Sequence, residues 1–166
     1  AYVEEVLHRS YHLAHTTHRS ILRGEVRGME AREVLRSLEA EGVLSGLRQL
    51  RPRRWSAAVE PGNIRRLAEC MGSLKAHFSA LTCIDLGDRF ELIYHFDLEG
   101  ELVNVSTLVP KALPALPSIA DIHPPADFYE REVAEMFGVK FEGAPRSGRL
   151  LLPEDWPPGE YPLRRW

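Results

Sequence analysis

The strongest constraint on this chain is the pattern of residues 126–166, where a short helix signal is followed by a long stretch without periodicity. Apolar residues recur at helical spacing up to Phe137, and Gly138 then stands where a left-handed helix cap is expected. Residues 139–166, here called the C-terminal strap, follow neither a helical nor a strand period. The strap is nevertheless rich in Trp, Phe, Leu, Pro and Arg, and protein interfaces are enriched in aromatic residues and Arg. We therefore predict a segment that docks on another protein rather than an active site.

The chain has the size and composition of one globular domain with an extension. It has 166 residues, of which 44% are hydrophobic and 27% charged, which is ordinary usage for a domain with a core. No apolar run approaches the roughly 18 residues that span a bilayer, and no signal-peptide pattern opens the chain. Cys70 and Cys83 are expected to be reduced and buried. Two thiols are too few for a self-contained iron–sulfur cluster or a cysteine-based zinc site, so we expect neither in this chain.

Residues 1–50 are predicted to form a helical extension, with helices over residues 2–22 and 29–40. His8, His12, His15 and His18 share one face of the first helix. Such a stripe can bind a divalent metal, but it lacks carboxylates, and a solvated or partner-facing stripe is the favoured interpretation. A basic cluster of Arg48, Arg51, Arg53 and Arg54 follows. The net charge of −3 argues against nucleic-acid binding.

Residues 51–125 read as an α+β core. Alternating patterns predict strands over residues 54–60, 80–86, 90–96 and 102–109, and a helix follows Pro61. Gly87-Asp88 and Glu99-Gly100 suit hairpin turns, so the last three strands should form an antiparallel meander, with the first strand and the helix packed on it. The fold class is thus α+β: a small, mostly antiparallel sheet with helices on one face. Prolines then become dense between residues 110 and 125 and are expected to carry the chain across the sheet.

Residues 126–166 make up the third region, the helix with its strap. Glu132 falls beside the apolar stripe of the helix, so it is expected to be partly desolvated and to need a cationic or hydrogen-bonding partner, for which Arg146, Arg149 and Arg164 are candidates. Arg131 and Glu135 are predicted to point outward, toward a partner protein. No nucleophile, glycine-rich phosphate loop or metal-ligand set accompanies these carboxylates in the sequence, which favours a structural role over acid–base catalysis. Asp121 and His123 form only a weak catalytic pair.

Four runs in this region resemble the signature of the respiratory complex I thirty-kilodalton subunit family. They are Glu130-Arg131-Glu132, Gly138-Val139-Lys140-Phe141-Glu142-Gly143, Leu151-Leu152-Pro153-Glu154-Asp155-Trp156 and Tyr161-Pro162-Leu163-Arg164. That family includes the “C” subunit of bacterial NADH:quinone oxidoreductase and the equivalent subunit of energy-converting membrane-bound [NiFe] hydrogenases. The resemblance is dense over residues 126–165, looser over residues 54–125, and finds no clear counterpart for residues 1–50.

The resemblance implies an α+β subunit that carries no cofactor of its own, performs no catalysis, and clamps the large subunit of a redox complex. Iron–sulfur clusters, and possibly a nickel–iron centre or quinone, would belong to the partner subunits: a forty-nine-kilodalton-like or hydrogenase large subunit and an iron–sulfur small subunit. The complex would place the chain peripherally on the cytoplasmic side of the cell membrane. The positions that match the motif, and for which a docking role is implied, are Glu130, Arg131, Glu132, Gly138, Phe141, Gly143, Pro145, Arg149, Leu152, Pro153, Trp156, Pro162, Leu163 and Arg164.

Two questions stay open at this point. The first is the branch of the family: the family usually has His at the position of Ala144, and the residues around Tyr161-Pro162 are more similar to the hydrogenase branch than to the quinone-reductase branch. The second is whether the chain is instead a free-standing adaptor or regulatory domain that makes its contacts through the N-terminal helices and the basic cluster.

Overall fold

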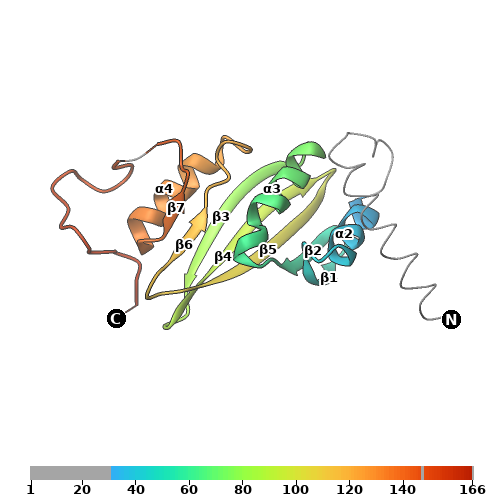
Figure 1. Ribbon diagram of the computed structural model, residues 1–166, viewed down its shortest axis with the longest axis horizontal. Coiled ribbons are helices and arrows are strands. Elements are labelled where there is room, and N and C mark those ends of the chain that lie inside the picture. Colours follow the sequence, from blue (N-terminus) through green and yellow to red (C-terminus); the bar gives the residue numbers. More distant parts are fainter. Residues whose placement is uncertain (1–30, 147, 166) are drawn as a thin grey trace.

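A five-stranded sheet forms the centre of the protein (Figure 1). The computed structural model describes residues 31–146 and 148–165. The predicted histidine stripe and the first helix lie outside the described residues. In chain order, the sheet contains β1 (Ser45–Arg51), β2 (Arg54–Ala58), β3 (His77–Asp85), β4 (Arg89–Leu98) and β5 (Glu101–Pro110). Their order across the sheet is β1-β2-β5-β4-β3, and only the β2–β5 pair is parallel.

The predicted meander of β3, β4 and β5 is confirmed. Along β4, alternate residues from Phe90 to Phe96 are buried, while the residues between them are half-exposed, as a sheet with one covered face requires. The β4–β5 hairpin turns at Glu99 and Gly100, whose φ angles of 53° and 82° are both positive. Two consecutive positive φ angles are the geometry of the tight turns that suit the twist of a hairpin.

Strand β2 takes a position that the sequence did not indicate. It was expected to pack on the meander with its helix, yet it joins the sheet as the parallel neighbour of β5, with Ala57 opposite Val105. Its alternate residues Trp55 and Ala57 are buried, so the predicted alternation is correct. The indole Nε1 of Trp55 donates a 2.8 Å hydrogen bond to Glu101, which joins β2 to the start of β5.

Strand β1 corrects the expectation that residues 45–50 belong to a helical extension. It is an edge strand with almost all of its residues exposed, and it pairs antiparallel with β2. Because neither face of β1 is buried, its sequence shows no alternation, and the arginines it carries are typical of a protected edge. The basic cluster Arg48–Arg54 is therefore the β1–β2 hairpin.

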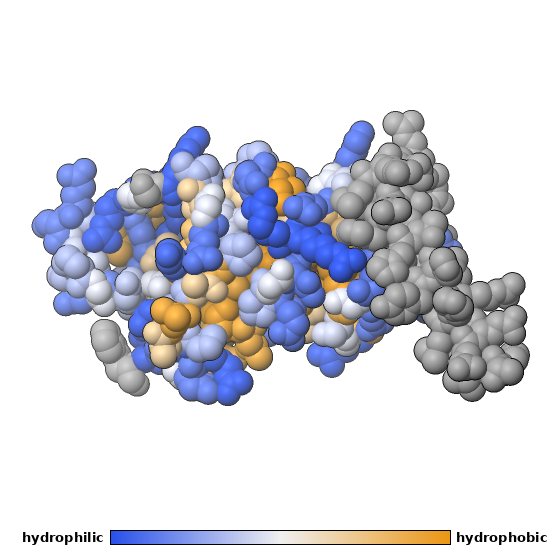
Figure 2. All heavy atoms as spheres, in the orientation of Figure 1, coloured by the Kyte–Doolittle hydropathy of each residue, from blue (hydrophilic) through white to orange (hydrophobic). Residues whose placement is uncertain are grey.

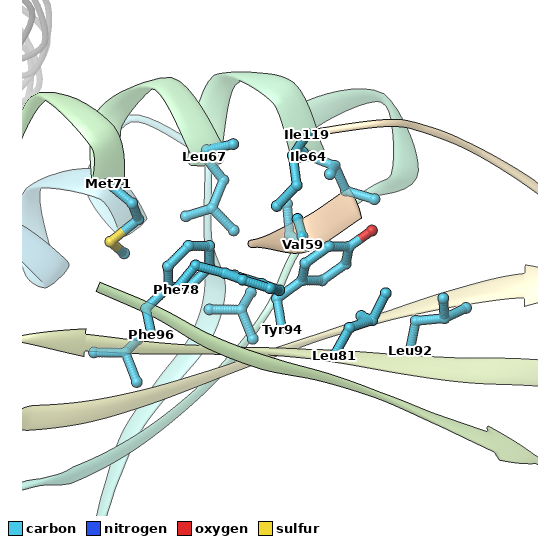
Figure 3. Close-up of a cluster of buried hydrophobic side chains, with 14 of the residues drawn as sticks. Val59, Ile64, Leu67, Met71, Phe78, Leu81, Leu92, Tyr94, Phe96 and Ile119 are labelled. Carbon is cyan, nitrogen blue, oxygen red and sulfur yellow. The ribbon is translucent and has the colours of Figure 1, made fainter. Parts of the chain in front are cut away.

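Three helices of the described residues complete the core. They are α2 (Ala31–Ala40), α3 (Ile64–Ser73), which a short 3-10 turn η1 (Pro61–Asn63) introduces, and α4 (Ala126–Phe137). Figure 1 shows α3 lying across the sheet, with α2 and α4 toward its two ends. Apolar faces of α3, β3 and β4 meet in one cluster (Figure 3), in which Phe78 and Phe96 pack edge to face at 5.5 Å. None of the helices in the described part of the chain is long and apolar enough to cross a membrane.

The proline-rich connection contains a short strand that was not predicted. Strand β6 (Ala115–Pro117) pairs in parallel with β7 (Lys140–Glu142), which follows α4, to make a separate two-stranded sheet. The Lys140 amide donates to the Pro114 carbonyl at 2.8 Å. Pro114 has no N–H to donate, but its carbonyl still takes part in the pairing of β6 with β7. This small sheet fixes where the strap leaves the core.

Candidate docking surface

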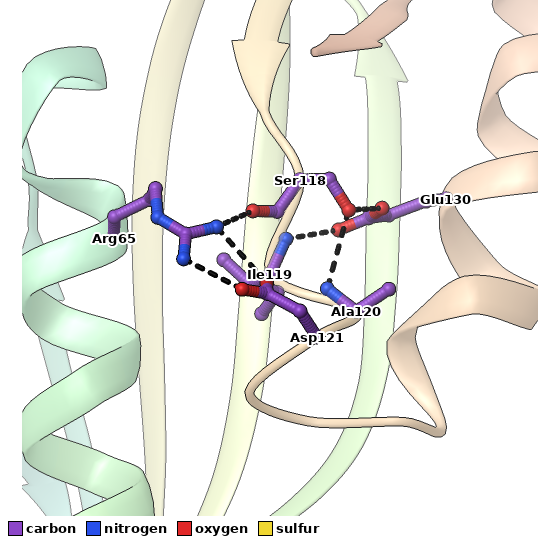
Figure 4. Close-up of polar contacts among 6 residues, drawn as sticks. All are labelled: Arg65, Ser118, Ile119, Ala120, Asp121 and Glu130. Atoms are coloured by element: carbon purple, nitrogen blue, oxygen red, sulfur yellow. Dashed lines mark hydrogen bonds and ion pairs between the residues drawn. The ribbon is translucent and has the colours of Figure 1, made fainter. Parts of the chain in front are cut away.

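Helix α4 carries a carboxylate buried against the proline-rich connection. Glu130 is only 1% exposed and accepts hydrogen bonds from the Ser118 hydroxyl at 2.5 Å and the Ile119 amide at 2.8 Å. Burial raises the pKa of Glu130 above its ordinary value, although both hydrogen bonds oppose that change. In Figure 4 the segment from Ser118 to Asp121 lies between Glu130 and Arg65. Arg65 donates to the Ser118 carbonyl and twice to Asp121, so α3 and α4 hold this segment from both sides.

A second carboxylate of α4 holds the strap by its main chain. Glu135 is 9% exposed, and its two oxygens accept from three successive amides, those of Leu150, Leu151 and Leu152, at 2.5, 2.8 and 3.1 Å. Burial opposes ionisation of this group, but the three donors outweigh it and lower the pKa of Glu135 below its ordinary value. The carboxylate therefore stays charged at neutral pH and fixes the backbone of an otherwise irregular segment.

Arg131, one turn earlier on α4, adds a contact to the same part of the strap. Its guanidinium donates to the Arg149 carbonyl at 2.8 Å. Arg149 in turn donates to the Trp156 carbonyl at 3.0 Å, and the Trp156 indole donates to the Glu160 carbonyl at 3.0 Å. These bonds run from α4 into the strap and then along it, so the strap is held as a shaped loop.

The end of α4 provides a second attachment. Gly138 has φ 72°, and its amide donates a hydrogen bond to the Ala134 carbonyl at the end of the helix, which confirms the predicted left-handed cap. The strap returns here: a Cβ on Gly138 would collide with the Tyr161 ring and lie 2.7 Å from the Arg164 guanidinium. That guanidinium lies 4.3 Å from the centre of the Tyr161 ring and donates to the Phe137 carbonyl at 2.6 Å. Only glycine permits this close approach.

A third attachment lies at the β3–β4 turn. The buried carboxylate of Asp85 accepts from Lys111 at 2.6 Å, from the Gly87 amide at 2.8 Å and from the Arg165 amide at 2.7 Å. The Lys111 ammonium also donates to the Arg165 carbonyl at 2.9 Å. The Lys111 hydrogen bond, with the two amides, lowers the pKa of Asp85 to about 2. The ion pair between Asp85 and Lys111 thus binds the main chain of the strap at Arg165, its last described residue.

The attached strap presents apolar side chains to solvent. Leu151 and Leu163 on the strap are 52% and 55% exposed, and Phe128 on α4 is 51% exposed. Figure 2 shows that hydrophilic and apolar areas both reach the surface on this face of the molecule. These three side chains project from a backbone that is already fixed. We take them, with the strap that carries them, as the candidate docking surface.

Two expectations about α4 are wrong. Arg131 and Glu135 do not point away toward a partner, because both bind the strap of their own chain. Glu132 is half-buried, in keeping with its predicted partial desolvation, but the fully buried carboxylate of α4 is Glu130, which the sequence did not single out. The helical-wheel argument failed because it treated α4 as facing only the sheet, whereas the proline-rich connection and the strap cover two further sides.

The strap residues that match the family motif lie in different surroundings. Phe141 is buried in the core through β7, and Trp156 and Tyr161 are half-buried in the intramolecular contacts described above. Gly143, Pro145, Arg149, Pro153, Pro162 and Leu163 are exposed, and Leu152 and Arg164 are half-buried. The sequence missed Ser118, Lys111 and Asp85. For Asp85 a signal existed, since an Asp two residues before a Gly is typical of a side-chain-capped turn.

The weak pair Asp121 and His123 does not form a catalytic site. Asp121 binds Arg65, while the imidazole of His123 lies 3.0 Å from the Ala68 carbonyl and packs on the rings of Phe78 and Phe96. Burial lowers the pKa of His123, which keeps it neutral. Within residues 31–146 and 148–165, no cluster of His, Cys, Asp and Glu side chains is arranged to hold a metal ion.

Comparisons with known proteins identify relatives of this surface and of the core. A family model described as the 30 Kd subunit of respiratory-chain NADH dehydrogenase matches residues 57–166, which include α4 and the whole strap. Membrane-bound hydrogenase subunit beta of Pyrococcus furiosus is 44% identical over 95 residues, covering 54% of this chain and 55% of that protein. The “C” subunit of NADH-quinone oxidoreductase from Chloroherpeton thalassium is 38% identical over 93 residues, covering 54% of this chain and 38% of that protein. The chain thus spans about half, or less, of these relatives.

Solved structures share the fold. A chain of the membrane-bound sulfane sulfur reductase, an archaeal respiratory membrane complex, superposes with a TM-score of 0.68 at 29% identity, covering 82% of this chain and 84% of that one. A trypsin-resistant fragment of Nqo5 superposes with a TM-score of 0.61 at 23% identity, covering 72% of this chain and all of the fragment, and shows the fold alone. The predicted resemblance and the predicted α+β class are both confirmed.

Proposed function

The chain belongs to the family of the 30 Kd subunit of respiratory-chain NADH dehydrogenase, and from this membership we propose that it is a structural subunit of a complex I-like, membrane-bound redox complex. In this role it holds no cofactor and performs no catalysis. It clamps the large subunit of the peripheral arm, while the iron–sulfur clusters, and the nickel–iron centre or quinone site, belong to partner subunits. The chain then lies on the cytoplasmic side of the membrane and reaches the membrane only through the complex. It supports electron transfer coupled to ion translocation by keeping the cofactor-bearing partner in position.

The single observation that carries this proposal is the fixation of the strap. Glu135, Arg164 and Asp85 hold its backbone at three separate places, so the exposed Leu151 and Leu163 are in place before any partner arrives. A preorganised surface binds without the entropy cost of ordering a loop. Exposed leucines on a loop with this many internal bonds favour docking over a free surface loop, which is usually polar and loosely held.

The test is a purification from the native host. Because Asp85 and Lys111 grip the main chain at Arg165, the affinity tag belongs at the N-terminus. The complex is isolated gently from solubilised membranes, the co-purifying subunits are identified by mass spectrometry, and the eluate is assayed. A large subunit with two Cys-x-x-Cys pairs and hydrogen-dependent dye reduction supports the hydrogenase type. A large subunit without them and donor-dependent quinone reduction supports the quinone-reductase type.

A second candidate is a free-standing adaptor or regulatory domain without a redox role. The observation that favours it is the exposed basic edge of β1, with Arg48 and Arg51 on a strand that pairs only with β2 within the described residues. An isolated monomer, with no membrane or redox partner in the same purification, would support the adaptor and contradict the structural subunit. A variant with Arg48→Ser and Arg51→Ser provides the matched control, because it removes the basic edge and leaves the strap intact.

A further inference from the structure

A cavity of about 760 Å³ lies between α4, β7 and the strap. Asp127 and Arg131 line it from α4, Phe141 from β7, and Arg149, Glu160 and Tyr161 from the strap. Its size falls within the range of about 300–1,000 Å³ that is typical of ligand sites. Its lining mixes charged and apolar side chains, and neither Leu151 nor Leu163 of the docking surface described above is part of it.

Two polar atoms of α4 are buried at this cavity without a hydrogen-bond partner among the described residues. They are Oδ1 of Asp127 and Nε of Arg131. Residues four apart on a helix lie on one face, one turn from each other. Buried polar atoms in proteins are nearly always paired, and leaving one unpaired costs about 1–3 kcal/mol. Both side chains also line the cavity, so a small rotation of either would bring its unpaired atom to a bound molecule, which could supply the missing donor and acceptor.

The chemistry of this pair selects the ligand. A free anion would suit Arg131 but would be repelled by Asp127, and a free cation would meet the reverse difficulty. A peptide group satisfies both, because its N–H donates to the carboxylate and its carbonyl accepts from the guanidinium. The neighbouring charges are already engaged with each other: Arg146 lies 3.8 Å from the other oxygen of Asp127, and Lys140 lies 3.8 Å from Glu142.

Strand β7 offers a main-chain edge to the same cavity. The Lys140 amide and the Glu142 carbonyl point toward β6, where they bond to Pro114 and Ser118 at 2.8 Å each. Since main-chain groups alternate sides along a strand, the N–H and carbonyl of Phe141 point the other way. The small sheet contains only β6 and β7 in the described part of the chain, so this edge is open. Extended peptides bind such edges by adding a strand.

We propose that this cavity receives an extended segment of the partner large subunit, bound mainly through its main chain between the β7 edge and the Asp127–Arg131 pair. The inference rests on the proposed function and deepens it by stating what the partner inserts. Recognition through peptide groups demands an extended, uncharged stretch rather than a particular side chain. The docking would then combine an apolar contact at the exposed leucines of the strap with an inserted segment beside it.

The first test uses Ala144, which lines the cavity and is exposed. A photo-cross-linking amino acid at position 144 is introduced into the tagged chain, with position 112 as the control, because Ala112 is equally an exposed alanine but does not line the cavity. After the complex is purified and irradiated, position 144 should cross-link to one contiguous segment of the large subunit. Cross-links from position 144 to another subunit, to a second copy or to the chain itself would overturn the inference.

A second test measures access to the cavity. Cysteine introduced at position 144 should react with a maleimide at least about tenfold more slowly in the complex than in the isolated chain. Cysteine at position 112 serves as the control for general shielding. The native thiols of Cys70 and Cys83 interfere little, because burial raises their pKa to about 11 and about 12. An intact complex in which position 144 reacts as fast as in the free chain would refute the insertion and leave the proposed function standing. Failure of the complex to form would refute both.

A third test weakens the acceptor. Asp127→Asn keeps the shape of the side chain but removes its charge and leaves one neutral oxygen, which accepts hydrogen bonds less strongly than a carboxylate. We expect it to weaken the complex about tenfold. Asp88→Asn, in the exposed β3–β4 turn far along the chain from α4, is the matched control and should leave the affinity unchanged. Equal affinities for the two variants would contradict the role assigned to Asp127.

Discussion

Glu135 should be the main residue that keeps the strap attached to α4, the state called closed below, so we refer to it as the latch. Its carboxylate accepts three main-chain hydrogen bonds from Leu150, Leu151 and Leu152. A hydrogen bond to a charged group is worth about 1.5–3 kcal/mol when buried, and the partial exposure of the strap reduces each of these to roughly 1 kcal/mol. Glu135→Ala should therefore weaken closure by about 3 kcal/mol. Glu135→Gln should weaken it by about 2 kcal/mol, because one neutral oxygen remains as an acceptor.

The assay is hydrogen–deuterium exchange of the isolated chain at neutral pH. A loss of about 2 kcal/mol corresponds to roughly a 30-fold change in the opening equilibrium of the strap. The amides of residues 150–152 should therefore exchange about 30-fold faster in Glu135→Gln, while β4 and β5 keep their protection. Glu132→Gln is the control, since Glu132 lies on the same helix and is only half-buried. Its exchange should match that of the native chain.

Two results would refute the latch. In the first, Glu135→Gln and Glu132→Gln exchange alike at residues 150–152. In the second, Glu135→Gln accelerates exchange equally in the central sheet, which would mean that Glu135 contributes to the free energy of global unfolding and not to attachment of the strap alone. The pH dependence gives a further check. Because the pKa of Glu135 is lowered in the folded chain, its contribution is present above its ordinary pKa of 4.5 and is lost as pH falls below that value.

Three other changes test the remaining attachments. Gly138→Ala should cost about 1–2 kcal/mol for the left-handed backbone plus the displacement of the Tyr161 ring, whereas Gly159→Ala, with φ 82° and open space around it, should show the backbone cost alone in urea unfolding. Glu130→Gln should remove a pH dependence. Since burial raises the pKa of Glu130, the native chain should lose stability relative to this variant as pH rises above 4.5, and equal dependence of the two chains on pH above that value would contradict the raised pKa. Asp85→Asn should speed amide exchange at Arg165 and abolish the loss of stability that occurs as pH falls from 3.8 toward the folded pKa of about 2, and an unchanged acid limb would exclude the ion pair with Lys111.

The parts of the fold that the sequence predicts are those in which one face is buried and the other is not. The alternation from Phe90 to Phe96, the α3 spacing of Ile64, Leu67 and Met71, and the cap at Gly138 all arise from this asymmetry. Strand β1 escaped prediction because it buries neither face. The parallel pairing of β2 with β5 also escaped, because periodicity identifies a strand but not its neighbour.

The candidate site was predictable in its location but not in its contacts. Aromatic and arginine content pointed to the strap, and the motif runs pointed to the family. Main-chain groups such as the Arg149 carbonyl and the Leu151 amide leave no trace in sequence, however, so the partners of Arg131 and Glu135 were assigned to another protein when they lie in this chain. The same reasoning explains why the burial of Glu130 was missed. A helical wheel predicts which side chains face one neighbouring element, whereas α4 packs against three: the sheet, the proline-rich connection and the strap.

The most direct test of the docking account compares hydrogen–deuterium exchange of this chain free and within the complex purified from its host. If the strap is the docking surface, protection should increase over residues 148–152 and 157–163 and at the N-terminal end of α4 near Phe128. The basic edge of β1 should exchange equally in the two states. Protection confined to β1 and β2, with the strap unchanged, would contradict the account and identify the opposite end of the sheet as the contact with the partner.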